Sequence, residues 1–332
     1  MSLNADVWGL IWSQCMGAPL RHVCKAWAAK NSPKLYWKRI STVALAKWAR
    51  EQSCPWDEDT FAYIAGHGHL DVLRYLHSEG CPLNNHAYNR ASRHGHLHVL
   101  QWMYKEASPK IIAPLGPAAS AHAARGGHLE VLVWLRSIGC DWESDTCSEA
   151  ADGQHLDVLK WLRSQECPWS EWTCAMAAGR GSIEIIEWAR ANGCSWGPWT
   201  CVYAARNGHL NVLQWLRSKN CPWNFRSCYS AARFGHFEIL KWAHSQGCPL
   251  DTSVVNAAAF TGNLEILQWL RANNCPWDEE ACSDAAIGGH LEVIKWLRAN
   301  GCPWDGRTRT YAVENGHKHV EAWAIENGCP AE

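Results

Sequence analysis

A repeat of 27 residues limits the possible folds of this chain more than any other feature. In most copies a glycine in the middle of the repeat is followed by histidine. This position is occupied by His69, His96, His128, His155, Ser182, His209, His236, Asn263, His290 and His317. Successive positions are 27 residues apart, except that 32 residues separate His96 from His128, so five residues are inserted once, within 108–117. Self-similarity at this period predicts stacked repeats.

Each repeat predicts two short helices, A and B. Helix A has about nine residues and ends in Ala-Ala-x-x-Gly, as at Ala204, Ala205 and Gly208. It begins after a residue whose small or polar side chain suits an N-cap. These N-cap residues are Asp57, Asn84, Ser170, Gly197, Asn224, Asp251, Asp278 and Asp305.

Helix B carries apolar residues at helical spacing, for example Leu210, Leu213 and Leu216. It ends before a glycine or asparagine, the residue types that tolerate a left-handed backbone. These end residues are Gly80, Gly139, Gly193, Asn220, Gly247, Asn274, Gly301 and Gly328.

One such hairpin cannot bury its own apolar face, so the copies must stack into a continuous solenoid. We therefore predict an all-α fold of about ten helix-turn-helix repeats over residues 54–328, with half a repeat at 41–53 and little or no strand. Residues 1–40 do not fit the repeat and form a separate predicted module, so the chain divides into 1–40 and 41–332.

The phrase Ala-Ala-x-x-Gly-His-Leu-Glu-Val-Leu, followed by Leu-Arg-x-x-Gly-Cys, resembles the ankyrin repeat from residue 41 to the C-terminus. That family's usual unit has about 33 residues. The six missing residues correspond to its β-hairpin finger. The resemblance therefore implies an ankyrin-like solenoid without fingers, of a kind that binds proteins.

The N-terminal module resembles an F-box. The resemblance rests on Leu3-Asn4-Ala5-Asp6-Val7-Trp8 with Ile11, on Leu20-Arg21-His22-Val23-Cys24-Lys25-Ala26-Trp27 and on Leu35-Tyr36-Trp37. It implies docking against a Skp1-type adaptor of a cullin-based ubiquitin ligase. The residues expected to dock are Val7, Leu10, Ile11, Leu20, Val23, Trp27 and Trp37. The alternative is that this segment only caps the solenoid.

Residues that recur in most copies are interpreted as structural. Of the 17 cysteines, ten stand at the end of a helix B turn and five more stand seven residues later, as small hydrophobic residues in a core would. The sequence contains no C-x-x-C pair of the kind that binds zinc. The histidine after glycine is expected to bond to the turn between helices, and two tryptophan columns are expected to pack between repeats. We expect no catalytic residue, metal or cofactor, and no enzymatic activity.

Charge and hydropathy indicate which kind of partner the chain binds and in which compartment it is expected. Residues 1–50 contain eight basic side chains and Asp6 as the one acid, whereas the rest contains 23 basic and 31 acidic groups. An acidic repeat array is a poor partner for nucleic acid. No apolar run is long enough to span a membrane and no secretory signal is present, so a cytoplasmic location is expected, in the host cell if the protein is viral.

Recognition is expected at helix A positions that differ from copy to copy, since packing between repeats demands sameness. We predict that a protein partner binds on the concave side at Trp172, Met176, Trp199, Tyr203, Arg206, Arg226, Tyr229, Arg233 and Phe260. The proline-rich insert at 109–117 either adds to that surface or is a tolerated loop.

Together these features favour a non-enzymatic adaptor, a substrate receptor of a ubiquitin ligase. The combination resembles F-box and ankyrin-repeat proteins of large DNA viruses and protists. A scaffold or decoy without a ligase link is the alternative.

Overall fold

The computed structural model describes residues 40–51, 56–107 and 115–331. All regular structure in these ranges is helical and none of it is strand, as the repeat pattern predicts. The seven docking residues from Val7 to Trp37 lie outside the described residues, as does most of the insert. The F-box-like module and the domain boundary after residue 40 therefore stay predictions.

The chain divides into two compact units, residues 1–168 and 169–332, and we describe each by itself. The described helices of the first unit are α4 (Val43–Glu51), α5 (Glu58–Ala65), α6 (Leu70–Ser78), α7 (Asn85–Arg93), α8 (Leu97–Trp102), η1 (Met103–Ala107), α9 (Pro117–Gly126), α10 (Leu129–Ser137), α11 (Ser144–Asp152) and α12 (Leu156–Ser164). From α5 onward, odd-numbered helices are A helices and even-numbered helices are B helices. Helix α4 packs against α6, and the half repeat at 41–53 stays a prediction.

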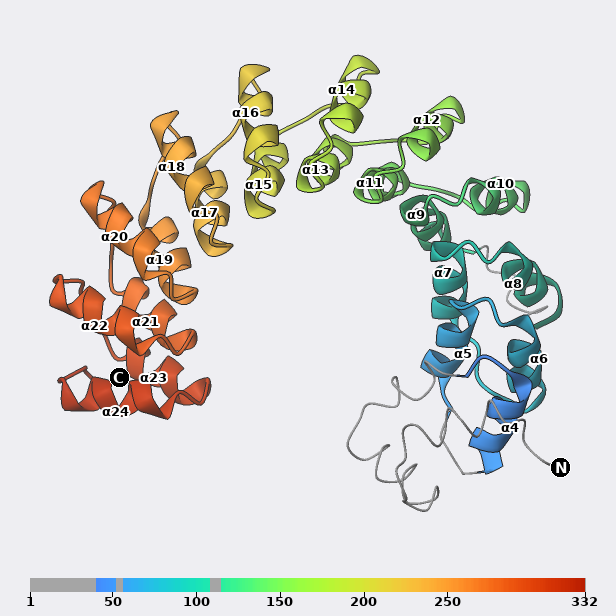
Figure 1. The fold of residues 1–332 in the computed structure, drawn as a ribbon, viewed down its shortest axis with the longest axis horizontal. Helices are drawn as coiled ribbons and strands as arrows, with labels where there is room; N and C mark the ends of the chain where they lie inside the picture. Colours follow the sequence, from blue (N-terminus) through green and yellow to red (C-terminus); the bar gives the residue numbers. More distant parts are fainter. Residues whose placement is uncertain (1–39, 52–55, 108–114, 332) are drawn as a thin grey trace, which may run out of the picture. The chain divides into compact units, whose positions relative to one another are not determined.

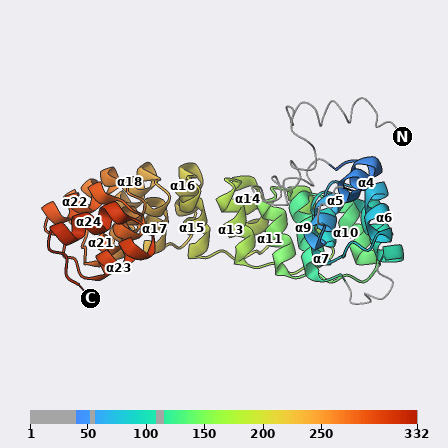
Figure 2. The ribbon, with the colours of Figure 1, turned by 90° about the horizontal axis from the view of Figure 1, so that it is seen from below.

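The second unit continues the same alternation. Its helices are α13 (Glu171–Gly179), α14 (Ile183–Ala191), α15 (Pro198–Arg206), α16 (Leu210–Ser218), α17 (Phe225–Arg233), α18 (Phe237–Ser245), α19 (Thr252–Phe260), α20 (Leu264–Ala272), α21 (Glu280–Ile287), α22 (Leu291–Ala299), α23 (Arg307–Glu314) and α24 (Lys318–Glu326). Figure 2 shows the same order of helices from another side.

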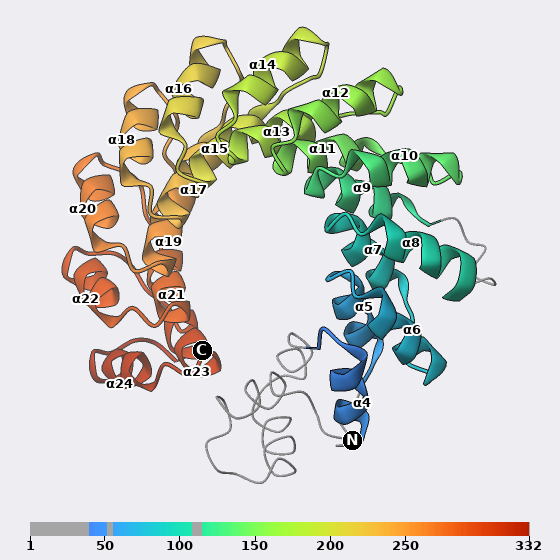
Figure 3. The same ribbon diagram turned by 45° about the vertical axis from the view of Figure 1, so that its right-hand side comes forward.

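Small residues let the A helices approach one another closely. In the second unit each A helix packs against the next A helix and against the B helix of its own repeat. Ala204 and Ala205 on α15 are fully buried, as are the larger Leu213 and Leu216 on α16. Because the A layer is built from smaller side chains than the B layer, this unit curves with its A helices on the inner side (Figure 1, Figure 3).

Most predicted helix starts are confirmed, and two are wrong by one residue. Helices α21 and α23 begin after Glu279 and Gly306 instead of Asp278 and Asp305. Each aspartate still accepts a hydrogen bond from the backbone N–H two residues later, at 3.1 Å in both cases. The aspartate therefore closes a turn that precedes the helix instead of capping its first residue.

The predicted helix ends adopt the left-handed backbone. Asn220 has φ +59° and Gly193 has φ +89°. In the repeat that lacks a glycine or asparagine here, Glu166 adopts φ +60°. Glu166 shows that the turn geometry is retained even where the side chain makes it less favourable.

Candidate functional site

The recurring histidine joins each repeat to the one before it. His209 Nε2 donates to the carbonyl oxygen of Gly179 at 3.2 Å, and His236 Nε2 donates to that of Arg206 at 3.0 Å. Both bonds link residues 30 positions apart, whereas the His128 bond to Arg93 spans 35 because it crosses the insertion. The predicted structural role is confirmed, with the bond directed to the end of the preceding A helix.

In several repeats the glycine before the histidine makes room for the histidine ring of the next repeat. Gly208 has φ +84°, and a Cβ there would lie 2.9 Å from Cε1 of His236. Burial lowers the pKa of the equivalent His96, although its bond to the Gly66 carbonyl acts in the opposite direction. The lowered pKa favours the neutral imidazole of His96, whose Nε2–H donates to the Gly66 carbonyl of the preceding repeat.

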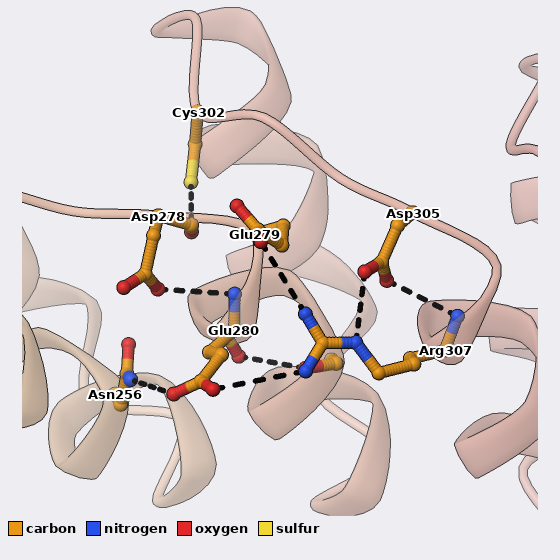
Figure 4. A network of polar contacts seen from close by, with 8 residues as sticks. Asn256, Asp278, Glu279, Glu280, Cys302, Asp305 and Arg307 are labelled. Atoms are coloured by element: carbon orange, nitrogen blue, oxygen red, sulfur yellow. Dashed lines mark hydrogen bonds and ion pairs between the residues drawn. The ribbon is translucent and has the colours of Figure 1, made fainter.

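The cysteines also join adjacent repeats. None of the 14 described cysteines forms a disulfide within the described residues, and all are buried. The leading cysteine donates from Sγ to a carbonyl just before the previous A helix, at 3.3 Å from Cys194 to Ser170 and 3.3 Å from Cys302 to Asp278 (Figure 4). The prediction of a small core residue is confirmed, and the structure adds a weak hydrogen bond to it.

Burial raises the pKa of several of these thiols. Burial raises the pKa of Cys275 to about 12. A hydrogen bond with Cys221 and burial both raise the pKa of Cys201. Since the thiolate is the metal ligand and the nucleophile, a raised pKa makes Cys201 and Cys275 poor candidates for either role. Within the described ranges, no group of three or more His, Cys, Asp or Glu side chains is placed to hold a metal ion.

The two tryptophan columns were expected to pack between repeats; their rings meet within a repeat, and the contact to the preceding repeat is made by an arginine. Trp196 meets Trp215 of its own repeat edge to face, with ring centroids 6.2 Å apart. Arg190 from the preceding helix B lies 4.5 Å from the Trp196 ring centroid. The same arrangement recurs at Arg298, Trp304 and Trp323. These aromatic rings are therefore used for cohesion along the array.

The predicted partner-binding residues all lie in the second unit, on A helices α13, α15, α17 and α19. The structure brings several of them into contact. The Trp172 ring lies 5.8 Å from Trp199 and 5.9 Å from Tyr203, and the Arg226 guanidinium lies 5.4 Å from the Trp199 ring. Residues from three successive repeats thus form one continuous set of side chains.

The remaining predicted residues extend this set or lie beside it. Arg206 contacts the Tyr203 ring at 5.9 Å, and Arg233 lies 3.4 Å from the Phe260 ring centroid. Tyr229 is 36% exposed, whereas Met176 is only partly exposed on α13.

Sequence reasoning missed Phe234, the C-cap of α17, which is 49% exposed and lies 4.9 Å from the Arg206 guanidinium. An aromatic residue in the place that Asn207 occupies one repeat earlier was the available signal.

A second cluster of charged side chains lies on α21 and α23 and was also missed. Arg307 pairs with Asp305 at 2.8 Å, Glu279 at 3.5 Å and Glu280 at 3.7 Å (Figure 4). Glu280 also accepts from Asn256 at 3.1 Å. Burial, together with the Glu280 charge, raises the pKa of Asp284 to about 6. Most of these groups already have a partner within the chain.

Comparison with known proteins adds little to this description. No protein-family model and no curated protein matches the chain. Among solved structures the chain is similar to the human ASB11 ankyrin repeat domain, at 18% sequence identity and a TM-score of 0.38, over 47% of this chain and 84% of that domain. A similarity of this size carries no argument about function, and the helical fold rests on the structure itself. No described helix combines the length and apolar character needed to cross a membrane.

Proposed function

We propose that this protein is a non-enzymatic adaptor that binds another protein through the A helix surface of its second unit. The observation that carries the proposal is that repeated side chains and variable side chains make different contacts. Repeated His, Cys and Trp residues contact neighbouring repeats, as His209 and Cys194 do, whereas Trp172, Trp199 and Arg226 gather at positions that no repeat pattern requires. Aromatic residues and arginine are enriched in the hot spots of protein interfaces.

The finer proposal is that the adaptor serves a ubiquitin ligase of the cullin and Skp1 type. It is supported by the F-box resemblance of residues 1–40, whose apolar residues would dock on the Skp1-type protein. The second unit would then present a captured protein as substrate. A cytoplasmic location, in a host cell if the protein is viral, belongs to the same proposal.

Two variants of the full chain test both parts together. Leu10→Asp with Ile11→Asp removes two expected docking residues, and Trp172→Ala with Trp199→Ala removes the aromatic pair on α13 and α15. We expect the first variant to lose binding of a purified Skp1-type protein and keep capture of its target from cell extract, and the second to show the reverse.

Each failure has a separate meaning. If the unchanged chain does not bind the Skp1-type protein, the ligase role is wrong and a scaffold or decoy role takes its place. If the tryptophan variant captures targets as well as the unchanged chain, the A helix surface is not the binding surface.

A further inference from the structure

Two neighbouring A helices carry an unbalanced positive charge. Helix α15 contains Arg206, helix α17 contains Arg226 and Arg233, and neither helix contains an acid. In the described part of the chain, none of these three guanidinium groups forms an ion pair. Arg307 on α23, by contrast, contacts three carboxylates of its own chain.

The unpaired arginines are nevertheless held in place. The Arg226 guanidinium lies 5.4 Å from the Trp199 ring centroid and 5.5 Å from that of Phe225, and the Arg206 guanidinium lies 4.9 Å from the Phe234 ring centroid. Contact with an aromatic ring attracts the cation without using its N–H donors. Ordering these long side chains in advance reduces the entropy lost when a ligand binds.

Apolar surface lies beside these cations. Trp172 packs against Trp199 and Tyr203, and all three are only partly buried. Tyr229 and Phe234 are two of the few large apolar side chains that are exposed in the described residues. We define the arginine-aromatic patch as Trp172, Trp199, Tyr203, Arg206, Arg226, Tyr229 and Phe234.

Charges near the patch limit what it can bind. The nearby Glu171 on α13 faces the N-cap of α15, since a Cβ on Gly197 would meet its Oε2 at 2.1 Å. The positive end of the α15 dipole lies there and offsets the carboxylate. Arg233 is attracted by the Asp284 carboxyl, which leaves Arg206 and Arg226 as the two cations with the least compensation.

We propose that the arginine-aromatic patch binds an acidic peptide segment of the partner protein. Aspartate or glutamate side chains of that segment pair with Arg206 and Arg226, and an apolar side chain between them packs on Trp172, Trp199 and Tyr203. A guanidinium matches a carboxylate with two parallel hydrogen bonds. The inference rests on the proposed function, because it names the chemistry of the partner that the A helix surface would recognise.

Three short fluorescein-labelled peptides test the proposal with the full chain. In the first peptide, glutamates alternate with leucine and tryptophan. In the second peptide each glutamate is replaced by glutamine, and in the third peptide each glutamate is replaced by lysine. Fluorescence anisotropy at physiological ionic strength measures the Kd of each peptide. We expect the glutamate peptide to bind at least about tenfold more tightly than the glutamine peptide, because each charge-assisted hydrogen bond adds discrimination of that order. The lysine peptide should not bind.

Matched arginine variants place the peptide on the patch. Arg206→Gln with Arg226→Gln should weaken the glutamate peptide by about tenfold or more. Arg309→Gln, on α23 outside the patch, should leave its Kd unchanged. Arg226→Glu should reverse the preference toward the lysine peptide. The thermal unfolding midpoint of each variant checks that the fold is retained.

The outcomes separate this inference from the proposed function. Equal binding of the glutamate and glutamine peptides, preference for the lysine peptide, no binding of the glutamate peptide, or unchanged binding by the double arginine variant would each overturn the acidic-partner proposal. The proposed adaptor function fails separately, if Trp172→Ala with Trp199→Ala leaves target capture from extract intact.

Discussion

Replacing Thr200 with valine is expected to stabilise the protein. Thr200 on α15 is fully buried, and its hydroxyl has no hydrogen-bond partner among the described residues. The equivalent Thr173 and Ser227 have buried hydroxyls in the same state. Two repeats later the same place is taken by Val254, which is also fully buried. The packing therefore accepts a valine there.

The size of the effect follows from the buried hydroxyl. An unsatisfied buried hydroxyl costs about 1–3 kcal/mol in proteins. Valine keeps the branched shape and nearly the volume of threonine, so Thr200→Val should raise the free energy of unfolding by about 1–2 kcal/mol. Urea unfolding of the full chain, followed by circular dichroism, measures this change. An unchanged slope with denaturant would show that the unfolded state is not responsible.

Thr261→Val provides the opposite case. The Thr261 hydroxyl donates to the carbonyls of Ala257 and Ala258, at 3.1 Å each, and the residue is exposed. Its replacement should leave stability unchanged or reduce it by up to about 1 kcal/mol. If Thr200→Val instead lowered the unfolding free energy, the reasoning would be refuted, because the hydroxyl would then have a partner in solution.

Three further perturbations test the packing and the electrostatics. Asp284→Asn should stabilise the chain by about 1 kcal/mol at pH 7, after allowance for solvent around this half-buried group. Because the pKa of Asp284 is raised from 3.8 to about 6, its unfavourable charge is present above pH 6, and the gain should shrink as pH falls toward 4. A gain independent of pH would contradict this. Gly208→Ala should lower the free energy of unfolding by about 2 kcal/mol, since alanine must adopt φ +84° and its Cβ meets the His236 ring. In a double-mutant cycle, part of that loss should disappear when His236 is also replaced by alanine. Strict additivity of the two changes would argue against the contact. Buried thiols such as Cys201 and Cys275 should react with a thiol reagent only as fast as the chain opens, as followed by mass spectrometry of labelled peptides; rapid labelling without denaturant would show that they are accessible.

Much of the fold could be predicted because each local sequence signal occurs in several copies of the repeat. N-cap residues, left-handed turn residues and apolar helix faces are local features, so their positions follow from spacing alone. Where a local signal has two solutions, the prediction was wrong by one residue, as at Asp278 and Asp305. The aspartate side chain caps equally well from a turn that precedes the helix.

For the contacts between repeats, the sequence predicted which residues take part but not which groups they contact. The sequence shows that His209 and Cys194 recur, but the acceptors at Gly179 and Ser170 lie 30 and 24 residues away. Only the stacking geometry selects them.

The proposed partner-binding surface was chosen from variation between copies, which points to Trp172, Trp199 and Arg226. Variation alone could not reveal which arginines lack a carboxylate partner, or that Phe234 supports Arg206. Those properties depend on distances between side chains of different repeats.

The most direct test of the division between cohesive and recognising residues compares two alanine variants of the full chain. His209→Ala removes the donor to the Gly179 carbonyl, and Arg226→Ala removes an exposed side chain over Trp199. In parallel urea unfolding experiments, we expect His209→Ala to lower the unfolding free energy by about 1–2 kcal/mol and Arg226→Ala to change it by less than about 0.5 kcal/mol. A loss of equal size in both variants, or no loss in His209→Ala, would contradict the assignment of repeated residues to cohesion and of variable residues to recognition.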